Sequence, residues 1–90
     1  MTTIDHQFTA TILGDMGPHK WDMVRVPNST EVLGTGKAVK VKATIDGIEV
    51  STGLLPSQGN HLLPIKGEIG RALGKSAGDE VTVHLIEVLS

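Results

Sequence analysis

Residues 37–55, KAVKVKATIDGIEVSTGLL, carry the strongest fold signal in the chain. Apolar and polar side chains alternate on both sides of Asp46-Gly47, with the period of two that is typical of half-buried strands. Asp-Gly is favoured in two-residue hairpin turns because both turn positions require a positive φ. Such a turn pairs Ile45 with Ile48, Ala43 with Val50 and Val41 with Thr52. The stretch therefore predicts a β-hairpin with one apolar face.

The two faces of this hairpin have different expected environments. The residues expected to point into the core are Val41, Ala43, Ile45, Ile48 and Val50. Those expected to point outward are Lys40, Lys42, Thr44 and Glu49. A slip of one residue would exchange the two faces, so burial of the apolar face fixes the register.

Four more strands are expected around the hairpin, over residues 7–13, 19–26, 61–66 and 80–89. Pro64 removes a ladder donor and predicts an edge strand or a bulged one. The last strand carries Leu85 on one face and Ile86 and Val88 on the other, which predicts that its second half is covered from both sides. A loop is expected at residues 14–18, which contain two glycines and a proline, and a polar loop at residues 56–60.

Two short helices are expected as well. Asn28 is placed at the start of the first, where its side chain can accept from a backbone N–H and Glu31 can reach back to it. Gly34 ends that helix. The second helix covers residues 68–73, and Gly74 suits the left-handed position after it. The residues expected on its inner face are Ile69, Ala72 and Leu73.

Length and composition indicate a single domain over residues 1–90. The chain has no cysteine, which fits a reducing cytoplasm and excludes a disulfide framework. Its N-terminal residues lack the basic and apolar segments of a secretory signal, and no apolar run is long enough to span a bilayer. The net charge of −2 argues against a nucleic-acid partner.

These elements predict a mostly β fold. A flat sheet of this composition would leave an apolar face exposed, whereas a closed sheet buries that face and removes the edges. The expected architecture is therefore a small closed six-stranded β-barrel with two short helices.

Two glycine-rich segments are interpreted as turn and helix-capping chemistry. Residues 70–76, GRALGKS, have Ile69 where the phosphate-loop motif requires glycine, and they close a helix instead of opening one. Residues 34–36 lack the second half of a dinucleotide fingerprint. No cofactor is expected.

The four histidines lack the spacing of a zinc site, and no metal is expected. They are His6, His19, His61 and His84. His61 follows the loop at residues 56–60, so it is either a packed histidine or a side chain that faces a ligand at a barrel rim. Ser57 and His61 form a conceivable catalytic dyad, but no nucleophile motif accompanies them and no catalytic residue is assigned.

Basic side chains follow the first strand of the hairpin. Lys37, Lys40 and Lys42, with Arg25 on another strand, are interpreted as a solvated face in which Glu49 pairs across strands, or as an anion-binding strip. The complete set of candidate ligand-binding residues is Arg25, Lys42, Ser57, Asn60, His61 and Arg71.

The order of motifs resembles a known family. It runs through F-x-A-x-I at residues 8–12, Trp21 before V-x-V-P at 24–27, G-x-G-K at 34–37, V-x-V-x-A-T-I-D-G at 39–47, L-L-P at 54–56, G-x-H at 59–61 and G-K-x-x-G-D-x-V-x-V at 74–83. The chain is similar to the uncharacterised domain-of-unknown-function family nineteen-oh-five, small bacterial domains. The resemblance implies a double-split β-barrel, a shape shared with swapped-hairpin transcription factors of the AbrB type. It implies no activity and no catalytic residues.

Three functional hypotheses follow. The first is a non-enzymatic module that binds a small molecule or a protein. The second, by analogy of fold and from the strip of lysines, is a DNA-binding regulator. The third is a small hydrolase that uses Ser57 and His61. A monomer is expected if one chain completes the barrel, and a homodimer if hairpins swap.

Overall fold

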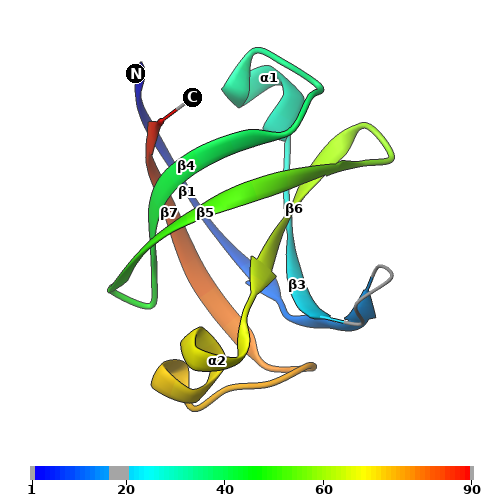
Figure 1. The fold of residues 1–90 in the computed structure, drawn as a ribbon, viewed down its shortest axis with the longest axis vertical. Helices are drawn as coiled ribbons and strands as arrows, with labels where there is room; N and C mark the ends of the chain where they lie inside the picture. Colours follow the sequence, from blue (N-terminus) through cyan, green and yellow to red (C-terminus); the bar gives the residue numbers. More distant parts are fainter. Residues whose placement is uncertain (1, 17–20, 90) are drawn as a thin grey trace.

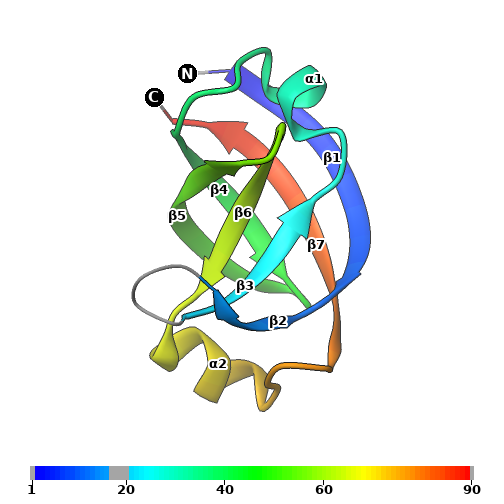
Figure 2. The same cartoon turned by 90° about the vertical axis from the view of Figure 1, so that its right-hand side faces the viewer.

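The computed structural model describes residues 2–16 and 21–89. Its strands are β1 (Thr2–Thr11), β2 (Leu13–Met16), β3 (Trp21–Val26), β4 (Val39–Ile45), β5 (Ile48–Ser57), β6 (Asn60–Ile65) and β7 (Glu80–Val88), and its helices are α1 (Ser29–Leu33) and α2 (Gly67–Leu73). The strands form one curled antiparallel sheet, a half-barrel, in the order β1-β7-β4-β5-β6-β3-β2 (Figure 1). The two helices lie at opposite ends of the sheet (Figure 2).

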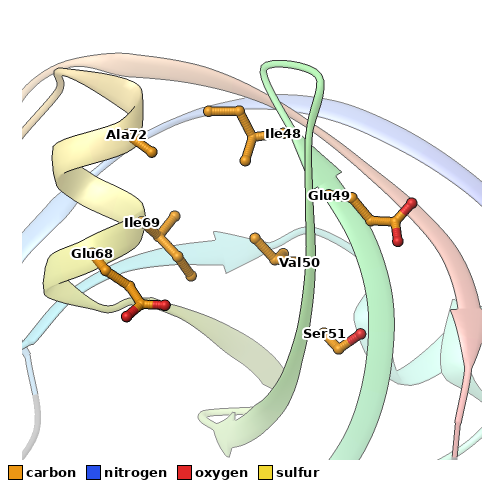
Figure 3. Close-up of a pocket in the computed structure, with 7 residues that line it drawn as sticks. All are labelled: Ile48, Glu49, Val50, Ser51, Glu68, Ile69 and Ala72. Atoms are coloured by element: carbon orange, nitrogen blue, oxygen red, sulfur yellow. The ribbon is translucent and has the colours of Figure 1, made fainter.

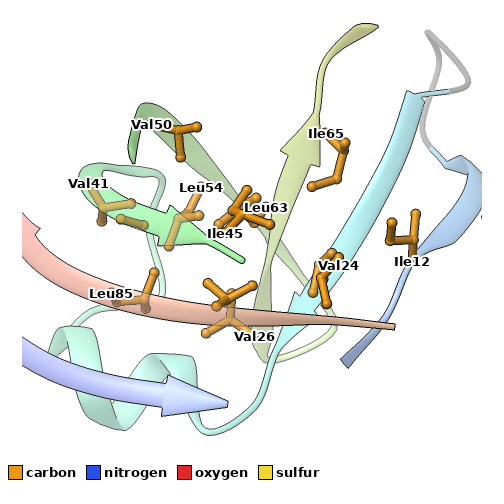
Figure 4. Close-up of a cluster of buried hydrophobic side chains, with 13 residues drawn as sticks. Ile12, Val24, Val26, Val41, Ile45, Val50, Leu54, Leu63, Ile65 and Leu85 are labelled. Carbon is orange, nitrogen blue, oxygen red and sulfur yellow. The ribbon is translucent and has the colours of Figure 1, made fainter. Parts of the chain in front are cut away.

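The concave side of this sheet holds a single aliphatic core (Figure 4). Its buried members come from β3, β4, β5, β6 and β7 and from Ile12, which lies between β1 and β2. β1 adds the partly buried side chains of Ile4, Phe8 and Ala10. The fully or nearly fully buried side chains include Ile12, Val24, Val26, Val41, Ala43, Ile45, Leu54, Leu63, Val81, Val83 and Leu85. Burial of these side chains on one face drives the sheet to curl, because apolar surface is removed from water only on that side.

The hairpin predicted from residues 37–55 is confirmed. Its strands are β4 and β5, and Ile45 lies opposite Ile48, as the two-residue turn requires. Asp46 and Gly47 have φ values of 50° and 86°, both in the left-handed region. The turn also has a tether that the pattern did not reveal, because the Asp46 carboxylate accepts the Thr82 N–H at 2.8 Å and the Lys75 ammonium at 2.7 Å.

The prediction that the second half of β7 is covered from both sides is wrong. The register between β4 and β7 shifts at Ile86: Ala43 lies opposite Leu85, whereas Lys42 lies opposite Glu87. One extra residue on β7 therefore forms a β-bulge, which returns Val88 to the same face as Leu85. Val88 packs against the core as a result. The apolar residues of β7 change from odd to even positions at Ile86 because of the bulge, and not because a second layer covers this strand.

The first predicted strand is longer and bent. Ile12 separates β1 from β2 and is 1% exposed, with its N–H bonded to the Asp79 carbonyl and its C=O accepting the Gly78 N–H. Residues 14–16, expected to be a loop, continue as β2. Gly14 is required there because a Cβ would lie 2.8 Å from the Ala77 Cβ. The rest of that expected loop and His19 lie outside the described residues.

Both predicted helices are present, with two corrections. Asn28 precedes α1 in a left-handed conformation and makes no side-chain capping bond, so the expected capping interaction is absent from this helix start. Ala72 is exposed on α2, whereas Ile69 and Leu73 pack on the core as expected. Gly34 and Gly74 do end the two helices with φ values of 73° and 68°.

The loop expected at residues 56–60 is a tight turn instead. β5 extends to Ser57 and β6 begins at Asn60, so Gln58 and Gly59 alone connect them, with φ values of 50° and 83°. The pair matches the geometry of a two-residue hairpin turn. Gln-Gly is not the preferred pair for such a turn, which is why the composition indicated a loop.

Within the described residues, neither helix is long and apolar enough to cross a bilayer.

Candidate functional site

The curled sheet has a split between β5 and β6. The β5–β6 ladder consists of Ser57 opposite Asn60, Pro56 opposite His61 and Leu55 opposite Leu62. Residues 48–54 of β5 pair only with β4, and residues 63–65 of β6 pair only with β3, within the part of the chain that the structure describes. One side of β5 is therefore an open strand edge over residues 48–54.

Pro64 explains why the ladder ends at this position. The residues that flank a two-residue turn form a hydrogen-bonded pair, and such pairs recur at every second position. Ser57–Asn60 and Leu55–Leu62 are therefore hydrogen-bonded pairs, and the next would join Gly53 to Pro64. Proline has no N–H to donate to β5. The edge strand predicted from Pro64 is confirmed on this side only, because β3 pairs with β6 along its other side.

The open edge of β5 borders a groove whose other wall is α2 (Figure 3). The groove consists of two adjoining hollows of about 360 and 560 Å³ that share Ser51, Glu68 and Ile69. In Figure 3, Ile69 and Ala72 lie on the side of α2 that faces Ile48 and Val50. We call this feature the β5–α2 groove.

The groove has an apolar part and a charged part. The apolar part is lined by Ile48, Val50, Ile69 and Ala72. The charged part is lined by Lys66, Glu68 and Arg71, together with Ser51 and Thr52. An apolar hollow beside a few convergent polar groups is the usual character of a small-molecule binding site.

Thr52 lies at the floor of the charged part and is 5% exposed. Its Oγ1 is buried and has no hydrogen-bond partner among the described residues. An unpaired buried hydroxyl costs about 1–3 kcal/mol. Such a group in a native fold requires an explanation, and one explanation is a ligand that supplies the partner.

The cations at this end of the groove are held in different ways. The Lys66 Nζ lies 5.9 Å from the centre of the Trp21 ring, within the range of a cation–π contact. The Arg71 guanidinium lies close to Gly67, where a Cβ would come within 3.4 Å of it. Neither cation is within ion-pair distance of a carboxylate among the described residues.

The structure brings only one of the six predicted candidates, Arg71, to the β5–α2 groove. Arg25 is half-buried on β3, and Ser57 and Asn60 flank the tight turn at the far end of β5. Lys42 lies on β4 and forms a 3.6 Å ion pair with Glu49, which lines the groove. The predicted set therefore does not converge on one surface.

His61 is fully buried, as the packed interpretation requires. Its Nε2 lies 2.8 Å from the Lys37 carbonyl and its Nδ1 lies 2.7 Å from the Ser29 Oγ. A carbonyl only accepts, so Nε2 carries the proton and donates it, and a neutral ring accepts the Ser29 hydroxyl at Nδ1. His61 thus connects α1 to the sheet. The serine it contacts is Ser29 and not Ser57, and both partners are buried away from any substrate.

The basic strip does not form as one surface. Arg25 is on β3, which β5 and β6 separate from the lysines of β4. The expected cross-strand pairing of Glu49 is confirmed, since its partner is Lys42. His84, in turn, contacts the Asp5 carboxylate at 2.6 Å on the outer surface.

Sequence reasoning missed the residues that line the groove: Ser51, Thr52, Lys66, Glu68 and Ile69. A signal for them existed in Pro64, because extending the register from the Gln58-Gly59 turn places this proline opposite Gly53. That step requires the turn to be recognised first, and the sequence indicated a loop there.

No group of three or more potential metal ligands occurs among the described histidines and carboxylates. Residues 8–85 match the family model DUF1905, described as a domain of unknown function. No curated protein matched the chain.

Proposed function

The chain belongs to the DUF1905 family, whose function is undefined, and we propose that this member is a non-enzymatic binding module with the β5–α2 groove as its binding surface. The observation that carries the proposal is the open edge of β5 beside an amphipathic groove. An unpaired strand edge is a ready template for association unless it is covered. The cations Lys66 and Arg71 add charged groups that a ligand can pair with.

The proposed architecture behind this surface is the closed, six-stranded, double-split barrel. β1 and β2 lie at opposite ends of the strand order, yet only Ile12 separates them in the chain. Counted as one bent strand, they complete the circle of strands. In such a barrel the split between β5 and β6 is an opening between two neighbouring strands. The oligomeric state, a monomer or a homodimer, stays a prediction. A bacterial origin and a cytoplasmic location also stay predictions.

The binding proposal is tested by an NMR titration of the ¹⁵N-labelled full chain. The probes are sodium acetate, inorganic phosphate, a neutral disaccharide and a short acetylated peptide, each raised to millimolar concentration. Saturable shifts confined to the amides of residues 48–53 and 66–72 support the proposal. Saturable shifts elsewhere, or none with any probe, contradict it.

The DNA-binding alternative has weaker support. Its motivating feature was a basic strip, and Arg25 lies two strands away from the β4–β5 hairpin that carries Lys42. It makes a separate prediction, that the protein binds duplex DNA with an affinity that falls steeply with salt. The hydrolase hypothesis lacks a geometric basis, because His61 contacts buried Ser29 and not Ser57.

A further inference from the structure

We infer that the β5–α2 groove binds the carboxyl-terminal end of an extended peptide, which adds a strand to the open edge of β5. This inference rests on the proposed binding role of the groove and names its ligand class. Three features lead to it: a row of backbone groups without a neighbouring strand, a cationic end beside an unpaired hydroxyl, and an apolar hollow that suits alternating side chains.

The backbone groups come first. Hydrogen-bonded pairs between β4 and β5 fall at Ile48, Val50, Thr52 and Leu54, by alternation from the turn. The N–H and C=O groups of Glu49, Ser51 and Gly53 therefore point away from β4, toward the groove. Within the described residues, these groups form no hydrogen bond to another strand. An extended peptide presents donors and acceptors at matching spacing, and this is how strand addition gains affinity.

The charges give the peptide a direction. The groove is closed where β5 and β6 rejoin at Leu55–Leu62, and Arg71 and Thr52 lie toward that end. A carboxylate placed there receives charge-assisted hydrogen bonds from Arg71, and it lies next to Thr52, whose buried Oγ1 has no partner among the described residues. The rest of the peptide then extends toward Ile48. It runs parallel to β5, because its terminus lies at the closed end.

The side chains of such a peptide meet different surroundings on its two faces. In an extended chain, alternate residues point to opposite sides. One set enters the apolar part of the groove between Val50 and Ile69, and the other lies beside the Glu49 side chain, which is 64% exposed. The preferred ligand therefore alternates small aliphatic residues with basic ones before a free carboxyl terminus.

The test uses one peptide and two chemically matched relatives. The probe is acetyl-Lys-Val-Lys-Val with a free carboxyl terminus, titrated by NMR into the full chain. The first relative has a carboxyl-terminal amide, and the second is N-methylated at alternate residues, which removes the ladder donors without changing the charge. Each relative is expected to bind at least about tenfold more weakly than the probe, since each lacks one recognition feature.

Two protein variants examine the same contacts from the other side. Arg71→Gln is expected to weaken the probe about tenfold and to leave the amide peptide unaffected, whereas Arg25→Gln, a matched change outside the groove, leaves both unchanged. Ser51→Pro removes a donor that points into the groove and keeps the bonds to β4, so it is expected to abolish probe binding in a folded protein. The folded state is checked by the spectrum of residues 39–47. The N-methylated peptide tests the same contact if Ser51→Pro does not fold.

The outcomes separate this inference from the proposed function. If acetate or phosphate shifts the groove amides and no peptide does, the peptide inference is wrong and the binding role stands. If the acid and amide peptides bind equally, the carboxyl-terminal assignment is wrong. If the protein alone forms a dimer that Ser51→Pro dissociates, a second copy of the chain occupies the edge and the inference is overturned.

Discussion

At the scale of single residues, the buried polar side chains of His61 and Thr52 differ in their hydrogen bonding. His61, near the β5–β6 turn, has its hydrogen bonds satisfied, whereas Thr52, beside the groove, does not. His61 uses both ring nitrogens, and its partners are Ser29 and the Lys37 carbonyl. Thr52 uses none of its hydroxyl capacity among the described residues. The first arrangement is a closed structural network. The second is incomplete, and it lies where the groove is.

Replacing Thr52 by valine is expected to stabilise the free protein. The change removes a buried hydroxyl without a partner, so the free energy of unfolding rises by about 1 kcal/mol. For a domain of this size that corresponds to a rise in Tm of roughly 4–8 °C. Urea or thermal denaturation measures it. A loss of stability would show that Thr52 has a partner in solution, such as a bound water.

Replacing His61 by leucine is expected to destabilise the protein. The change leaves the buried Ser29 hydroxyl and the partly buried Lys37 carbonyl without partners, at a cost of about 2–4 kcal/mol. The double variant His61→Leu/Ser29→Ala is expected to lose less than the sum of the two single variants, since it removes one of the orphaned groups. Denaturation of all four proteins gives the coupling. Strict additivity would mean that the His61–Ser29 bond contributes nothing.

At the scale of elements, two hairpins with turns of the same length set the register of the β4–β5–β6 sheet segment. Asp46-Gly47 has the preferred composition, whereas Gln58-Gly59 places glutamine at a φ of 50°. Left-handed backbone is more costly for glutamine than for asparagine or glycine. The Thr30 hydroxyl, which donates to the Gly59 carbonyl at 2.5 Å, holds this second turn against α1.

The second turn predicts opposite effects for two substitutions. Gln58→Asn is expected to stabilise the protein by about 0.5 kcal/mol, because Asn-Gly is preferred in such turns. Gly59→Ala is expected to destabilise it by about 1 kcal/mol, because alanine resists the positive φ. A Cβ on Gly59 meets nothing within 4 Å, so a steric clash does not contribute. Equilibrium unfolding in urea compares both with the parent, and equal signs would contradict the assigned turn.

At the scale of the whole molecule, hydrogen bonds between segments that are distant in the sequence connect the strands at the end of the sheet where α2 lies. The Asp46 turn is tied to Lys75, after α2, and to Thr82 on β7, and Lys75 also donates to the Glu80 carbonyl. The bend at Ile12 is bonded to Gly78 and Asp79 of the same connection. The segment between α2 and β7 therefore links the hairpin to the β1–β2 bend.

This linkage predicts a loss of stability in acid. The hydrogen bonds from Lys75 and from the Thr82 N–H hold the pKa of Asp46 below its ordinary value of 3.8. Because the folded-state pKa is the lower one, the contribution is complete above pH 3.8 and is lost as the pH falls through the folded value. Asp46→Asn keeps the turn and removes the charge, and it is expected to cost about 0.5–1 kcal/mol at neutral pH.

The acid dependence is measured by denaturation at a series of pH values. The stability difference between the parent and Asp46→Asn is expected to shrink below pH 3.8 and to vanish once the carboxyl is protonated. Lys75→Met is the matched variant on the other side of the pair. A difference that does not change with pH would show that the charge of Asp46 is not involved.

Local chemistry in the sequence was enough to determine the central hairpin and its register, the existence of both helices and the glycines that end them, and most of the aliphatic core face. The exception on that face is Ile48, which was expected to point into the core but is half-buried and lines the groove. Positive φ at Asp-Gly, period-two alternation and glycine after a helix act over a few residues and do not depend on distant partners. The family resemblance is likewise confirmed over residues 8–85. Even Pro64 was correctly interpreted as an interruption of the ladder.

Only the tertiary structure decided which strand loses its neighbour at Pro64, and that the edge of β5 is left open there. The β-bulge at Ile86, the bend at Ile12 and the burial of His61 depend on which strands are neighbours, and strand pairing joins residues far apart in the sequence. The groove exists because Pro64 lies opposite Gly53 while α2 lies beside the edge of β5 left open there. The central hairpin is therefore more than a structural pair, since its second strand supplies the open edge from which the proposed binding follows.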